Sequence, residues 1–179
     1  MAIKLYNPTT PGLRGMTTQD MSEITAKRPI KSLLVIKKRV SGRNNQGRIT
    51  TRHRGGGAKQ FYRLVNFKMA EGSSAVIEAI EYDPNRSARI ARIKESNGTY
   101  HYVLAAKGMA VGQQIQSGEE APIETGNRLA IKNIPVGSLI YGIEIQPGRG
   151  AQMVRSAGVS AQLMAKEGEY AQVRMPSGE

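Results

Sequence analysis

From Phe61 onward, apolar and polar positions alternate over short stretches that end at residues favouring turns. The alternation is clear in TYHYVLAA (99–106), where Tyr100, Tyr102 and Leu104 fall on one side of the chain. A period of two is typical of a half-buried β-strand. In SLIYGIEI (138–145) the same period places four apolar residues on one face, namely Leu139, Tyr141, Ile143 and Ile145. We therefore predict strands at 61–67, 75–83, 87–95, 99–106 and 138–145.

Turn residues join several of these segments into hairpins. Asn97-Gly98 separates two of the predicted strands, and both residues tolerate positive φ angles. A second hairpin is predicted at Lys166-Glu167-Gly168. Several short strands at this spacing favour small β-barrels over a helix bundle or a parallel sheet. No sustained helical pattern occurs, although the residues near Ala105–Ala110 are compatible with a short helix.

The first 60 residues follow a different pattern. Residues 1–30 contain several Pro and Gly and show little periodicity, which predicts an extended arm without a core of its own. Residues 31–40 are a short strand candidate, and the stretch 41–60, in which Gly, Asn and Arg are frequent, predicts an irregular loop. Because 112–127 is rich in Gly and Glu, we place a domain boundary there. The expected fold is mostly β, with an extended basic N-terminal arm over 1–60, one barrel over 61–125 and another over 126–179.

Charge is distributed unevenly along the 179 residues. Lys and Arg number 26 against 14 Asp and Glu, and 15 of the basic residues but only two acidic ones fall within 1–68. Like charges repel in a compact state, so a long one-sign stretch predicts a partner that neutralises it. Arg dominates the densest part and presents a planar fork that matches phosphate oxygens; these residues are Arg39, Arg43, Arg48, Arg52 and Arg54. The stretch is too broken by Gly and Asn for a membrane-binding amphipathic helix, which favours nucleic acid.

Residue types and motifs that are typical of enzyme active sites are scarce in this sequence. Cys is absent, and the two histidines, His53 and His101, cannot supply a usual zinc ligand set. GRNNQGRIT (42–50) has the glycine spacing of a phosphate-binding loop, but Arg48 and Ile49 replace the required Lys and hydroxyl. No apolar run approaches a membrane span, and the first residues lack the pattern of a secretion signal. We expect a soluble intracellular protein that is no enzyme and uses no cofactor, metal or small-molecule substrate.

The candidate contacts to nucleic acid lie in three segments. Three successive glycines in RHRGGGAKQ (52–60) let the backbone approach a ligand closely, although a flexible linker is an alternative. DPNRSAR (83–89) and GRGAQMVRSAG (148–158) place arginines in turns among small residues, where a solvated charge is the alternative. Most aromatic residues fall in predicted strands, which favours recognition of backbone and shape over stacking on bases. The candidate residues are Arg43, Arg48, Arg52, His53, Arg54, Gly55, Gly56, Gly57, Lys59, Arg86, Arg89, Arg149 and Arg155.

Four motifs then follow one another in a specific order, GRNNQGRITTRHRGGGAK, YDPNRSARIA, NIPVGSLIYGIEIQPGRGAQMVRSAG and EGEYAQVRMPSGE. Together they resemble the bacterial-type L-two family of large-subunit ribosomal proteins. The resemblance implies an OB-fold barrel followed by an SH3-like barrel, and binding to large-subunit rRNA. It also implies a structural role in translation, in which the protein supports subunit association and the peptidyl-transferase region.

The resemblance also assigns roles to individual residues. Arg86 and Arg155 match the family's principal rRNA-binding arginines, and the loop from Arg43 to Lys59 matches the part that threads into rRNA. Neighbouring ribosomal proteins and the small subunit at the intersubunit face are implied partners, in a cytoplasmic bacterial-type or an organellar ribosome. The family continues into a basic, Gly-rich C-terminal extension that this sequence lacks. The residues by themselves leave two alternatives, a DNA-binding architectural protein and an RNA-modifying enzyme.

Overall fold

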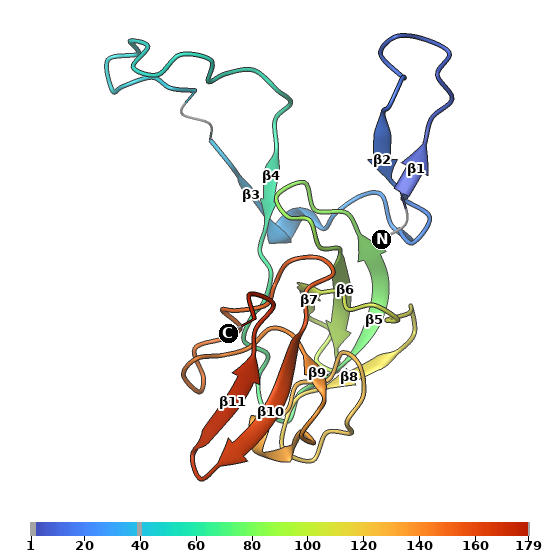
Figure 1. The fold of residues 1–179 in the computed structure, drawn as a ribbon, viewed down its shortest axis with the longest axis vertical. Coiled ribbons are helices and arrows are strands. Elements are labelled where there is room, and N and C mark those ends of the chain that lie inside the picture. The colour runs from blue at the N-terminus through green and yellow to red at the C-terminus, as the bar shows by residue number, and fades with distance from the viewer. Residues whose placement is uncertain (1–2, 39–40, 179) are drawn as a thin grey trace.

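The computed structural model describes residues 3–38 and 41–178, so the predicted contribution of Arg39 and the end of the strand candidate at Val40 lie outside the described residues. The described chain is mostly β, with short strands in four antiparallel sheets and two 3₁₀ helices (Figure 1). The strands are β1 (Ile3–Leu5), β2 (Thr17–Gln19), β3 (Leu34–Ile36), β4 (Phe61–Arg63), β5 (Ser74–Glu81), β6 (Ile90–Glu95), β7 (Tyr100–Leu104), β8 (Gln114–Gln116), β9 (Leu139–Ile140), β10 (Ala161–Glu167) and β11 (Tyr170–Arg174). The 3₁₀ helices are η1 (Lys31–Leu33) and η2 (Ile131–Asn133). In the described ranges no helix is long or apolar enough for a membrane crossing.

The larger sheet has the strand order β7-β6-β5-β8 and carries the main core. Burial alternates along β5, as expected for a strand with one face inward. Ile77, Ile93 and Ile115 are at most 1% exposed and pack with smaller residues and two methionines. A register shift in the β5–β6 pair between Ile77 and Ala79 marks a bulge, which bends a sheet and increases its twist. The arrangement is compatible with the expected OB-fold barrel.

The smaller sheet has the order β11-β10-β9, and Ala161 and Leu163 of β10 are buried, as is Val154 outside the strands. The hairpins predicted at Asn97-Gly98 and at Gly168 are confirmed, because β6 pairs with β7 and β10 with β11, both antiparallel. The sheet is compatible with the expected SH3-like barrel.

The strand predicted over 138–145 is largely wrong. Only β9 forms there, and Leu139 and Ile145 are 71% and 64% exposed. Gly142 interrupts the segment with φ of +63° and donates its N–H to the carbonyl of Val154 at 3.0 Å. A left-handed residue breaks the alternation of faces, so the apolar positions do not share one buried face.

The N-terminal region also differs from the prediction. Residues 3–19 form the β1–β2 hairpin, which the sequence pattern did not predict. Beyond it, the chain lies against the larger sheet: Thr25 donates its N–H to the carbonyl of Ile80 at 3.0 Å, and Ile30 donates its N–H to the Tyr102 hydroxyl at 2.9 Å. The start of the 31–40 strand candidate is η1, and residues 105–110 hold a turn in place of a helix.

Two hairpins project from the compact part of the molecule (Figure 1). One is β1–β2, and the other begins at the antiparallel β3–β4 pair, in which Leu34 faces Arg63 and Ile36 faces Phe61. We call residues 37–60 the projecting loop. Figure 1 shows it reaching away from both main sheets, so its described residues meet solvent on most sides.

Candidate nucleic-acid interface

The projecting loop exposes its predicted contact residues. All of Arg43, Arg48, Arg52, His53, Arg54 and Lys59 are exposed, as are Gly55, Gly56 and Gly57. The tip folds on itself, because Arg43 and Ile49 form an antiparallel bridge and the Asn44 side chain accepts the N–H groups of Gln46 and Arg48 at 3.0 and 2.9 Å. The tip therefore has a definite local turn within the segment for which the sequence predicted an irregular loop.

Glycine is required at the base of this tip. Gly42 has φ of +63°, and a Cβ there would lie 2.4 Å from the Thr51 carbonyl oxygen. Gly55 and Gly56 are different, because a Cβ at either position would meet nothing within 4 Å. The space beside their Cα atoms is therefore open, which suits a close approach by a ligand.

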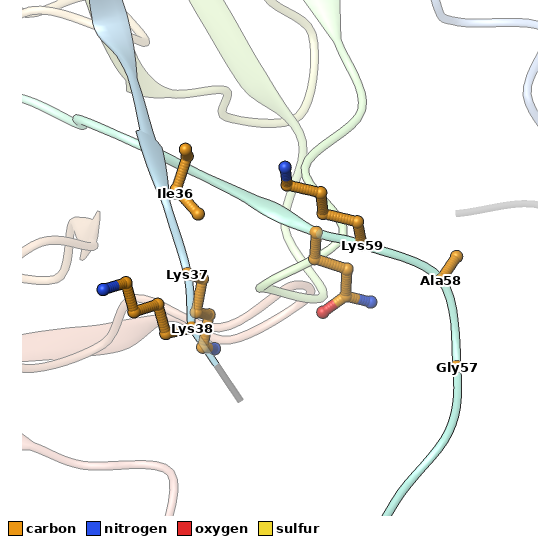
Figure 2. Close-up of a pocket in the computed structure, with 7 residues that line it drawn as sticks. Ile36, Lys37, Lys38, Gly57, Ala58 and Lys59 are labelled. Carbon is orange, nitrogen blue, oxygen red and sulfur yellow. The ribbon is translucent and has the colours of Figure 1, made fainter. Parts of the chain in front are cut away.

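A hollow opens where the projecting loop joins β3 and β4 (Figure 2). Three lysines line it, Lys37, Lys38 and Lys59. Figure 2 shows their ammonium groups at separate points around the hollow. Lys37 donates to the Asn85 side-chain oxygen at 3.2 Å, and the Lys59 Nζ lies 5.6 Å from the centre of the Phe61 ring. The hollow adds positive charge to the loop without forming a compact anion site, and the sequence analysis did not single out Lys37 or Lys38.

The turn after β5 holds Arg86 in a fixed position. Asp83 is fully buried, and its carboxylate accepts the Asn85 N–H at 2.8 Å and the Arg86 Nε at 2.5 Å. The Asn85 side chain also donates to the Phe61 carbonyl at 2.8 Å, which ties the turn to β4. Charge-assisted hydrogen bonds of this kind are strong and directional. The Arg86 side chain keeps 17% of its surface exposed, so it can still reach a ligand.

The structure brings Arg86 and Arg155 together at one aromatic ring. The Arg155 Cζ lies 4.8 Å from the centre of the Phe67 ring, and the Arg86 Cζ lies 5.8 Å from it. Arg86 also lies 5.9 Å from the Tyr62 ring centre. We call Arg86, Arg155 and Phe67 the arginine cluster. Asp83 already neutralises part of the charge of Arg86, and the exposed Arg155 adds a second cation at the same ring that an anion can approach.

The other two predicted arginines differ in their surroundings. Arg149 is exposed in the turn at 147–150, and the next residue, Gly150, packs against Phe67, where a Cβ would lie 3.1 Å from the carbonyl oxygen. Arg89 is only 5% exposed and donates to the Asp20 carbonyl at 2.9 Å. Burial of Arg89 does not fit the direct contact that the sequence predicted. Its guanidinium instead holds the N-terminal segment against the body.

Several aromatic residues are more exposed than the sequence predicted. Phe61, Tyr62 and Tyr82 are 37%, 38% and 42% exposed, whereas Tyr102 is fully buried. Each of the three exposed rings lies within 6 Å of a Lys or Arg cation. A cation over a ring competes with a base for that face of the ring.

The two histidines lie in unlike surroundings. His53 is an exposed residue of the projecting loop with φ of +59°, and His101 faces the Glu95 carboxylate at 3.5 Å. Within residues 3–38 and 41–178, no group of three or more His, Cys, Asp or Glu side chains is placed to hold a metal ion.

Two family models match this chain. The model described as "Ribosomal Proteins L2, RNA binding N-terminal domain" matches residues 30–117, which include the projecting loop and Arg86. The model described as "Ribosomal Proteins L2, C-terminal domain" matches residues 124–179, which include Arg149 and Arg155. The arginine cluster therefore joins residues from both matched segments. The chain belongs to the L2 family of ribosomal proteins, RNA-binding constituents of the large ribosomal subunit.

Proposed function

We propose that this protein binds large-subunit rRNA through the projecting loop and the arginine cluster, as a structural constituent of the large subunit. The observation that carries the proposal is the meeting of Arg86 and Arg155 at Phe67, two partly or fully exposed cations from separate matched segments. The projecting loop supports it, because its described basic residues are exposed and no acidic residue occurs between Glu23 and Glu71.

The two parts of the surface have different tasks in this proposal. The projecting loop enters between closely packed RNA strands, where its Arg and Lys side chains neutralise phosphates and release counterions. The arginine cluster is held by the folded body and fixes the register of the protein on the RNA, as phosphate contacts commonly do. Recognition in this proposal is by the shape and backbone of folded RNA, because the surface is built mainly from cations and three of the exposed rings already contact one.

At the level of the ribosome, we propose a supporting role. A compact β body with a long basic projection holds separate RNA segments together, which suits support of the peptidyl-transferase region and of subunit association. Its partners would then be rRNA, neighbouring ribosomal proteins and the small subunit, in a bacterial-type or organellar ribosome. Of the proposed regions 1–60, 61–125 and 126–179, the first contains the projecting loop and the other two together supply the arginine cluster.

The test is binding of the full chain to folded large-subunit rRNA. Arg86→Ala and Arg155→Ala are each expected to weaken binding by roughly 1–3 kcal/mol, the range for specific polar contacts. Arg174→Ala is the matched control, because Arg174 is exposed on β11 and is not among the proposed contacts. Wild-type affinity in both cluster variants would reject these assignments. Equal affinity for duplex DNA at ~0.15 M salt, where long-range attraction is screened, would reject rRNA as the partner.

A further inference from the structure

We propose that Phe67 is a positioning residue that couples Arg86 to Arg155, so that the two guanidinium groups bind RNA as one unit. The inference rests on the proposed function, which supplies the RNA contact, and adds a residue that the sequence placed only in a predicted strand. It follows from how the backbone of Phe67 is held and from what lies against its ring.

The backbone at Phe67 is fixed by residues of both matched segments. The preceding residue, Asn66, donates its N–H to the carbonyl of Tyr102 in β7 at 2.7 Å. The Phe67 carbonyl accepts the N–H of Ala151 at 2.9 Å and lies 3.3 Å from Nη1 of Arg128. The close approach of Gly150 to the same carbonyl leaves little room for the peptide to shift. The ring therefore starts from a well-defined position between the two matched segments.

The two arginines depend on this ring to different degrees. Arg86 has further support from Asp83 and Tyr62. Arg155 reaches the Ala151 carbonyl at 3.4 Å, which is long for a hydrogen bond, and lies closer to the Phe67 ring than Arg86 does. Both distances fall within the range of about 6 Å over which a ring face attracts a cation. Loss of the ring should thus release Arg155 more than Arg86.

A purely structural role of Phe67 and a positioning role predict different effects of its substitution on RNA binding. If Phe67 only filled space, a substitution that keeps apolar volume would leave the contribution of each arginine unchanged. If it positions the arginines, loss of the π face would reduce what Arg155 adds to RNA binding. The quantity that distinguishes the two roles is the coupling free energy between Phe67 and Arg155, which a double-mutant cycle measures.

The experiment compares rRNA affinities of the full chain in a cycle of Phe67→Leu and Arg155→Ala, with Phe67→Tyr as the conservative variant. Phe67→Leu is expected to lower affinity about 5- to 20-fold, within the range of cation–π contacts. Arg155→Ala should then cost less in the Phe67→Leu background than in the wild type. Phe67→Tyr keeps the ring face and is expected to bind like the wild type. Unchanged affinity in Phe67→Leu, or an equal cost of Arg155→Ala in both backgrounds, would overturn the coupling.

Two further measurements keep the proposal testable should Phe67→Leu fail to fold. Arg155→Lys leaves the ring intact and keeps the charge, but loses the planar group that stacks on it, so affinity should fall. In the free protein, NMR should show upfield ring-current shifts on the Arg155 side-chain protons. Wild-type affinity in Arg155→Lys, or the absence of these shifts, would contradict the positioning role. If Arg86→Ala and Arg155→Ala both bind like the wild type, the part of the proposed function that makes the arginine cluster an RNA contact fails.

Discussion

At the scale of single residues, one buried phenol joins the core to the N-terminal segment. Glu81 is 2% exposed, and its carboxylate accepts the Tyr102 hydroxyl at 2.9 Å and Nη1 of Arg92 at 3.0 Å. The same hydroxyl accepts the N–H of Ile30. Burial raises the pKa of Glu81 and, with the hydrogen bond to Glu81, raises the pKa of Tyr102 to about 12. The phenol therefore stays protonated near neutral pH and donates its hydrogen bond to the Glu81 carboxylate.

Tyr102→Phe should destabilise the fold without changing its shape. The substitution leaves one buried lone pair of Glu81 and the Ile30 N–H without the hydroxyl, and such losses cost about 1–3 kcal/mol. Urea denaturation measures the change in the free energy of unfolding. Tyr100→Phe on the same strand is the control, since Tyr100 is only partly buried and a change within about 0.5 kcal/mol is expected. Equal stability of Tyr102→Phe and the wild type would show that the hydroxyl contributes nothing.

At the scale of elements, predictions from the sequence succeed where the structure depends on neighbours in the chain. The strand at 99–106 and the turn at Asn97-Gly98 need only alternation and a residue that tolerates positive φ, and Gly98 has φ of +84°. The prediction for 138–145 fails because the chain turns at Gly142, and the pattern of apolar residues does not encode that turn.

For the candidate site, too, the sequence predicts local features but not contacts between distant residues. Arg86 and Arg155 stand in recognisable motifs, so each could be chosen from the sequence alone. Their meeting at Phe67 could not, because it depends on contacts between residues far apart in the chain. The burial of Arg89 against Asp20 is likewise a tertiary effect, since the N-terminal segment folds back onto the body. Phe67 lies in a stretch of alternating apolar residues, and nothing in that pattern distinguishes a ring buried in the core from a ring that contacts arginines.

The contrast between residues 25–30 and the projecting loop predicts different rates of proteolysis. Both segments offer exposed basic residues to trypsin, Lys27 in the first and several in the second; Arg28 is no site, because Pro29 follows it. The first segment is fastened at Thr25 and Ile30, so cleavage there requires local unfolding. Trypsin should cut the free protein within 43–59 before it cuts after Lys27, as mass spectrometry of the early fragments would show. Earlier cleavage after Lys27 would mean that the segment is not docked in solution.

At the scale of the whole molecule, the excess positive charge and most of the buried core lie in different parts of the chain. The surplus lies in the first 68 residues, whereas residues 69–179 hold 11 basic and 12 acidic side chains. Several charges of the body are already paired within it, such as Arg92 with Glu81 and Arg128 with Glu144. Among the residues that the structure describes, exposed cations outside such ion pairs are densest in the projecting loop. The loop should therefore dominate the salt dependence of binding, while the arginine cluster sets the geometry.

A double substitution in the loop should separate these two contributions. Arg52→Ala with Arg54→Ala removes two phosphate contacts in the proposal, and each contact adds about 0.7–0.9 to the slope of log affinity against log salt. The slope measured with folded rRNA should therefore fall by about 1.5. Lys107→Ala with Arg174→Ala removes equal charge from exposed positions of the body and should leave the slope nearly unchanged. Equal reductions in both double variants would mean that net charge alone attracts the RNA, and that the loop has no privileged position on it.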